Sequence, residues 1–99
     1  MKNYPELVYL ARAYFHQDCI IPVGEPLGAL RDFLEHETGE IKYAVLNDID
    51  QAISELTEHD AKGLWLQNGD VVFDPTSIGI PCLEWFSMIG MTIRKGISS

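Results

Sequence analysis

The residues best suited to chemistry lie together near the N-terminus, where His16, Asp18 and Cys19 follow one another closely. An imidazole, a carboxylate and a thiol could bind a metal ion, or the imidazole could activate the thiol as a nucleophile. No second group of Cys and His completes a tetrahedral metal set, and no Gly-rich nest supplies an oxyanion hole. We therefore expect no metal site and no catalytic site here, and a thiol or metal enzyme remains the less favoured alternative.

Other sequence patterns of known chemistry are also missing. The sequence contains no Walker loop, dinucleotide-binding fingerprint, HExxH motif or EF-hand loop. Pairs of carboxylates are frequent, but none is marked as a general acid in an apolar pocket. The sequence therefore predicts a protein that is not an enzyme, needs no cofactor and acts through a surface.

The charge of the chain indicates what that surface would bind. The 99 residues carry a formal charge of -8, and the stretch from Asp32 to Glu84 has 12 acidic residues against only Lys42 and Lys62. Such a surface repels phosphate backbones and anionic membranes, and it attracts a basic partner over a long range. We expect a basic protein as the partner, with no direct binding of nucleic acid or membranes; the charge does not indicate the oligomeric state.

The acidic residues gather on the most periodic segment of the chain, from about Glu40 to Glu58, which predicts a helix. One side of this helix is apolar and comprises Ile41, Val45, Ile49, Ala52, Ile53 and Leu56. The opposite side is acidic and contains no cation. A second acidic strip follows further along the chain. The candidate binding residues are Asp48, Asp50, Glu55 and Glu58 in the helix, with Asp70 and Asp74 in the second strip.

The remaining patterns predict further helices. Asn3 and Glu6 have the spacing of a capping box before a helix that ends near Phe15, and Pro26 begins a second helix that ends at Thr38 and Gly39. Residues 60–66 form either a short helix, which Asp60 caps and a left-handed Gly69 ends, or part of a β-hairpin near residues 64–73. A last helix runs from Pro81 to Gly96.

These elements predict an all-α fold, a small bundle of four to five short helices, in one domain spanning residues 1–99. Cys19 and Cys82 are far apart and read as apolar residues in a reducing compartment, with a long-range disulfide as the alternative. The N-terminus lacks a secretory signal and no apolar run is long enough to span a bilayer, so we expect a cytoplasmic protein.

The last helix supplies a second functional hypothesis. It is apolar on almost every side, which is typical of a helix at the centre of a core. Trp85, Met88 and Met91 could instead form a protein-binding face of a small regulatory or scaffold domain, because aromatic and Met side chains are favoured at the centres of interfaces.

A compact aromatic and polar block closes the first helical pattern. It consists of Tyr14, Phe15, His16, Gln17 and Asp18. The aromatic pair can anchor a core, and the polar residues must be hydrogen-bonded if they are buried. We expect the block to have a structural role, fixing the loop that follows the helix.

This block, together with several shorter matches, resembles a family of bacterial contact-dependent growth inhibition immunity proteins. The shorter matches are Pro5-Glu6-Leu7, the stretch from Leu30 to Leu34, Gly69, Pro75 and Glu84-Trp85. The resemblance covers most of the chain and is most specific in its first third. It implies a cytoplasmic protein that binds and neutralises a cognate toxin domain, commonly a nuclease, without chemistry of its own.

Overall fold

The fold was examined in a computed structural model that describes residues 4–15, 26–69, 71 and 73–98. These residues form helices and contain no strand in any described range, which confirms the predicted all-α fold. The elements, in chain order, are α1 (Pro5–Tyr14), the 3-10 helix η1 (Pro26–Ala29), α2 (Leu30–His36), α3 (Gly39–Glu55), α4 (Glu58–Gly63), the π-helix η2 (Leu64–Asn68), the 3-10 helix η3 (Pro75–Ile78) and α5 (Cys82–Ser98).

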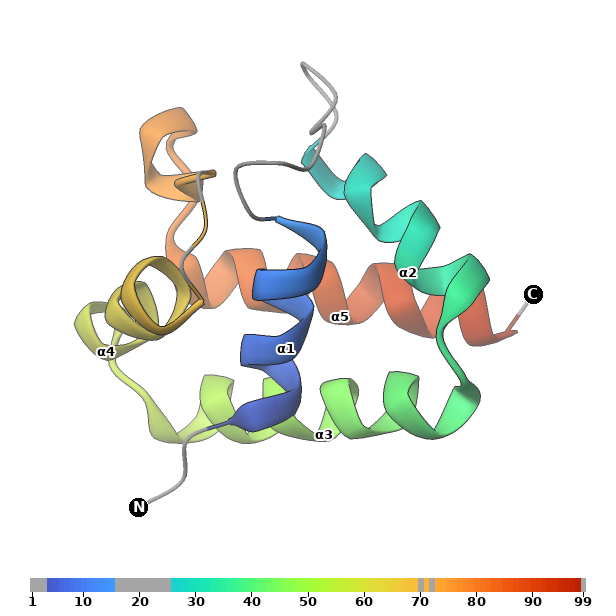
Figure 1. The fold of residues 1–99 in the computed structure, drawn as a ribbon. Helices are drawn as coiled ribbons and strands as arrows, with labels where there is room; N and C mark the ends of the chain where they lie inside the picture. Colours follow the sequence, from blue (N-terminus) through green and yellow to red (C-terminus); the bar gives the residue numbers. More distant parts are fainter. Residues whose placement is uncertain (1–3, 16–25, 70, 72, 99) are drawn as a thin grey trace.

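The two long helices, α3 and α5, lie side by side and run in opposite directions, while α1 crosses both of them (Figure 1). The α2 helix packs on the C-terminal half of α5, and α4 and η2 lie at the other end of the molecule. The α3 and α5 helices approach closely at Gly90, where an added Cβ would lie 3.4 Å from Ile49 Cγ2 and 3.9 Å from Leu46 Cδ2. This close packing buries Leu46, whereas Ile53, which the periodicity placed on the buried side, is 38% exposed.

The segment predicted as one helix from Glu40 to Glu58 is two helices. The α3 helix ends at Glu55, and Leu56 has an extended backbone with φ -95° and ψ 147°. The next residue, Thr57, begins α4, because its side chain accepts a hydrogen bond from the backbone N–H of Asp60 at 3.2 Å. Thr38 caps α3 in the same way, through the N–H of Ile41 at 3.3 Å. Each threonine satisfies one of the free N–H groups of a helix start.

The alternative of a β-hairpin near residues 64–73 is wrong, because residues 64–68 continue α4 as the π-helix η2. Asp60 lies within α4 and does not cap it. Gly69 is also not left-handed, since its φ is -74°. The glycine is needed for space: an added Cβ would lie 2.5 Å from Trp65 O and 2.7 Å from Ala11 Cβ, so only glycine lets α1 approach η2 this closely.

The last helix does not end at Gly96 but continues to Ser98. Gly96 lies against α2, where an added Cβ would be 2.6 Å from Leu34 Cδ2. This glycine therefore serves helix packing and is not a helix terminator.

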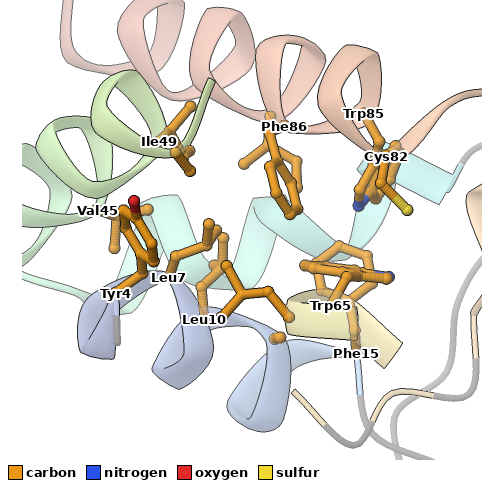
Figure 2. Close-up of a cluster of buried hydrophobic side chains, with 14 of the residues drawn as sticks. Tyr4, Leu7, Leu10, Phe15, Val45, Ile49, Trp65, Cys82, Trp85 and Phe86 are labelled. Carbon is orange, nitrogen blue, oxygen red and sulfur yellow. The ribbon is translucent and has the colours of Figure 1, made fainter. Parts of the chain in front are cut away.

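The core contains a cluster of aromatic rings in edge-to-face contact (Figure 2). Phe15 lies 5.2 Å from Trp65 and 5.8 Å from Trp85 between ring centroids, and the two tryptophans are 5.7 Å apart. All three rings are fully buried, and Trp65 Nε1 donates to Phe73 O at 3.0 Å. Such contacts add about 0.5–1.5 kcal/mol per pair beyond burial. The cluster joins α1, η2 and α5, which are distant in sequence.

The close approach at Gly69 yields a stability prediction with an internal control. Gly69→Ala should lower the free energy of unfolding by about 1–3 kcal/mol, because the new methyl group overlaps Trp65 O and Ala11. Gly63→Ala, where nothing lies within 4 Å of the new Cβ in the described structure, should be neutral or stabilising by about 0.5–1 kcal/mol. Urea unfolding of the two variants measures both, and equal stability would contradict the packing described here.

Candidate functional site

Asp48, the first of the predicted binding residues, caps the first helix. Its Oδ2 accepts hydrogen bonds from the backbone N–H groups of Glu6 at 2.8 Å and Leu7 at 3.2 Å. The residue before α1, Tyr4, is left-handed with φ 48° and makes no side-chain cap. Asn3, which was expected to cap this helix, lies outside the described residues. A carboxylate from α3 therefore takes the place of a local cap and also complements the positive end of the helix dipole.

Glu58 does the same for the last helix. Its Oε2 accepts from the backbone N–H of Cys82 at 2.6 Å, and its Oε1 accepts from that of Leu83 at 3.0 Å. Glu58 is half-buried in the first turn of α4. Both of its oxygens are thus used to join α4 to the start of α5.

Asp74 caps the short helix η3. Its Oδ1 accepts from the N–H of Thr76 at 2.9 Å and from the Thr76 hydroxyl at 2.6 Å. The hydroxyl bond lowers the pKa of Asp74, partly opposed by burial. Asp70, the other residue of the predicted second strip, lies outside the described residues.

Asp50 and Glu55 are the exposed members of the predicted set. Both oxygens of Asp50 lie 2.9 Å from Arg94 Nη2 of α5, and the two side chains are more than half exposed. An exposed ion pair of this kind stabilises the fold by less than about 1 kcal/mol. Glu55 Oε1 accepts from the Tyr4 hydroxyl at 2.8 Å. Burial, together with this bond to Glu55, raises the pKa of Tyr4 to about 12.

The predicted acidic residues therefore divide into two groups. Three half-buried carboxylates, Asp48, Glu58 and Asp74, accept hydrogen bonds at helix starts. The two exposed ones, Asp50 and Glu55 of α3, bond side chains, those of Arg94 and Tyr4, and not helix starts. The pattern of charges in the sequence could not distinguish these two groups of carboxylates. Whether a carboxylate caps a helix depends on which helix start the tertiary fold places beside it.

The structure contains a polar cluster around Glu37 that the sequence patterns did not indicate. Glu37 Oε2 accepts from the hydroxyls of Tyr9 at 2.5 Å and Tyr14 at 2.7 Å. These two bonds lower the pKa of Glu37. The pKa of Tyr9 is raised by its bond to Glu37 and then by burial, and the pKa of Tyr14 is raised by burial and then by its bond to Glu37. The ring of Tyr14 also makes an edge contact with Phe33 at 5.5 Å. The cluster thus fixes the linker between α2 and α3 on α1.

Of the aromatic and polar block, the described residues are Tyr14 and Phe15, and both pack against the core. His16, Gln17 and Asp18 lie outside the described residues, as does Cys19, so the structure tests neither the structural role expected of the polar residues nor the alternative of a thiol or metal site. Cys82 is a free, buried thiol. Its burial, followed by the charges of Glu58 and Asp74, raises its pKa to about 11, which keeps the thiol protonated and a poor nucleophile at neutral pH.

The structure has no exposed apolar face that combines Trp85, Met88 and Met91. Trp85 is fully buried and Met88 is half-buried against the core, while Met91 is 62% exposed. The helix is central to the core, as its composition indicates, and only Met91 of these three residues is open to a partner.

The part of the chain that the structure describes has shallow grooves and one group of potential metal ligands. A groove of about 660 Å³ lies along α4 and η2, and another of about 560 Å³ lies between α1 and η2; Gln67 and Asn68 line both. Asp32, Glu35 and His36 place ligand atoms within 4.8 Å of one another, but all three are exposed on α2. Exposed acidic groups of this kind are common without a metal, and neither feature converges on a reaction site.

Comparison with known proteins identifies the class of molecule that this small helical fold represents. A sequence profile of the CdiI immunity protein family matches residues 3–93, which is nearly the whole chain. The chain therefore belongs to the CdiI immunity protein family, as the resemblance in its first third indicated. Family membership implies a cognate toxin protein as the partner and suggests an inhibitor without catalysis.

No curated protein and no solved structure matches the chain significantly. Within the described ranges, no helix combines the length and the apolar character that a membrane span requires.

The cap at α5 predicts a large effect from a single carboxylate. Glu58→Ala should lower the free energy of unfolding by about 1–3 kcal/mol, because two half-buried N–H groups lose their acceptor. Glu84→Ala, an exposed residue in the first turn of α5, should change it by less than about 0.5 kcal/mol. Thermal or urea unfolding compares the two variants, and an equally small effect of Glu58→Ala would show that its carboxylate does not hold the helix start.

The Glu37 cluster predicts a pH dependence. Because the pKa of Glu37 is lowered below its usual value of 4.5 on folding, its stabilisation is complete above pH 4.5 and is lost as the pH falls through the folded-state pKa. Glu37→Gln should therefore be less stable than the wild type at pH 7, with a difference that shrinks in acid. Urea unfolding at several pH values measures this difference, and a constant difference across the range would contradict it.

Proposed function

We propose that this chain neutralises the toxic C-terminal domain of a contact-dependent growth inhibition system by binding it stoichiometrically in the cytoplasm. Membership of the CdiI immunity protein family carries this proposal. The further elements of it, namely a nuclease toxin, an electrostatic mode of capture and the residues that make contact, rest on the charge and geometry of the chain.

The charge supports a basic partner that itself binds phosphates. Nucleases present cationic grooves to nucleic acid, and a protein of formal charge -8 can occupy such a groove in its place. Complementary fields also accelerate encounter, to about 10⁸–10⁹ M⁻¹s⁻¹ at low salt. Fast capture suits an antidote, because each free toxin molecule turns over substrate until it is bound.

Among the predicted contact residues, Asp50 and Glu55 are those we assign to the toxin. Both are exposed and both lie on α3, so a partner can reach them without disturbing a helix cap. Asp48, Glu58 and Asp74 contribute to the negative field, but we assign their main role to the fold, since each accepts its hydrogen bonds at the start of a helix. We keep Asp70 as a proposed contact residue because of its charge alone.

The test uses a candidate toxin, namely the C-terminal domain of the protein whose gene lies immediately upstream of the gene for this chain. Co-expression should protect cells from that domain, and the purified pair should form a 1:1 complex. Asp50→Lys combined with Glu55→Lys should lower the association rate by about tenfold or more at low salt and flatten its salt dependence. The dissociation rate should change less.

The matched control is Asp32→Lys combined with Glu35→Lys, which changes the net charge by the same amount at two exposed positions on α2. Stopped-flow association at several salt concentrations compares the two double variants at equal concentrations of folded protein. If both double variants slow association equally, the association rate depends on the net charge and not on the position of the charges on α3. Failure of the wild-type chain to bind or to protect would refute the proposed function itself.

A further inference from the structure

The outer surface of the α3 and α5 pair carries an apolar patch. In the described part of the chain, five large apolar side chains are exposed, and three of them, Tyr43, Ile53 and Met91, belong to these two helices. Tyr43 is 60% exposed and Met91 is 62% exposed. The other two lie elsewhere: Tyr9 bonds Glu37, and Ile78 is on η3.

Helical spacing places these side chains on one surface. On α3, Tyr43, Leu46, Asp50 and Ile53 recur every three or four residues and share one side of the helix. Leu46 faces α5 at Gly90, which identifies this side as the one that borders α5. On α5, Arg94 reaches Asp50, and Met91 is its neighbour one turn earlier.

The ion pair between Asp50 and Arg94 therefore lies where the two helices meet, with Tyr43, Ile53 and Met91 around it. We call the three apolar residues, Tyr43, Ile53 and Met91, the α3–α5 patch. An exposed tyrosine, a methionine and an arginine are the residue types enriched at the centres of protein interfaces. The main neighbours of α3 are α1 and α5, and the exposure of Tyr43 shows that this side of α3 is not covered.

The charges around the patch indicate the kind of protein that would cover it. Asp50 is matched by Arg94, and the exposed Glu40 lies one turn before Tyr43 on α3. On α5, the exposed Glu84 lies two turns before Met91 and the exposed Lys95 one turn after it. The patch is thus apolar at its centre, with charges of both signs around it, on a chain that is acidic as a whole. A second copy of this chain would bring another charge of -8 against it, whereas a basic protein would be attracted.

We propose that the α3–α5 patch is the surface that holds the toxin domain, with Tyr43 and Met91 filling an apolar hollow whose edge carries lysine or arginine. This inference rests on the proposed function and adds the contacts that keep the complex together. The acidic surface governs the rate of encounter, and the patch governs the lifetime of the complex.

Separate measurements of association and dissociation test the proposal. The probe is the purified C-terminal domain from the upstream reading frame, titrated against the whole chain and its variants. Tyr43→Ala and Met91→Ala should each raise the dissociation rate about tenfold or more and leave the association rate within about twofold. Because the contacts are apolar, these ratios should persist at high salt, where surface charges are screened.

Ile78→Ala is the matched control, since Ile78 is 57% exposed but lies on η3, outside the patch. It should change neither rate. All three positions are exposed, so the variants should unfold at the same temperature as the wild type, which circular dichroism checks.

The outcomes distinguish this inference from the function on which it rests. If the wild type binds and the patch variants dissociate like the control, the patch is not the contact surface, while the proposed function stands. If the wild type does not bind the domain, both fail. If the free chain dimerises and Tyr43→Ala makes it monomeric, a second copy covers the patch and the inference is wrong.

Discussion

Two carboxylates from the middle of the chain hold the starts of its first and last helices. Asp48 on α3 accepts from the first turn of α1, and Glu58 on α4 accepts from the first turn of α5. Four backbone N–H groups that α-helices leave unsatisfied are thereby bonded across the fold. The long-range contacts among α1, α3 and α5, and the aromatic cluster that joins them, depend on these helices starting where they do.

Because some carboxylates cap helices, the acidic composition of this chain affects both its fold and its surface charge. A protein that repels phosphates and attracts basic proteins needs many acidic groups, and like charges on one helix slightly destabilise it. Turning some of them toward helix starts offsets that cost, because an anion near a helix N-terminus is stabilising. Other carboxylates stay exposed, such as Asp50, which pairs with Arg94 and lies on the same side of α3 as the exposed Tyr43.

The helices could be predicted from the sequence because their signals are local. Apolar spacing and a proline at the start suffice for α1, and the block from Tyr14 to Asp18 was specific enough to indicate the family. One error was local: Leu56 continues the apolar period of α3, yet the helix breaks there because Thr57 caps α4 through Asp60. Another came from a tertiary contact: Gly69 looked like a turn residue although it is a packing contact with Ala11. The candidate site was harder, because burial of Trp85 and capping by Asp48 depend on elements far away in sequence.

The most direct measurement is the crystal structure of this chain bound to its cognate toxin domain. We expect Asp48 and Glu58 to keep their hydrogen bonds to the N–H groups of α1 and α5, while the toxin covers the exposed side of α3 and α5. Cationic side chains of the toxin should lie near the acidic residues at the edge of this covered surface. A complex in which the toxin's lysines or arginines draw Asp48 or Glu58 away from the helix starts, or in which the outer side of α3 remains in solvent, would contradict it.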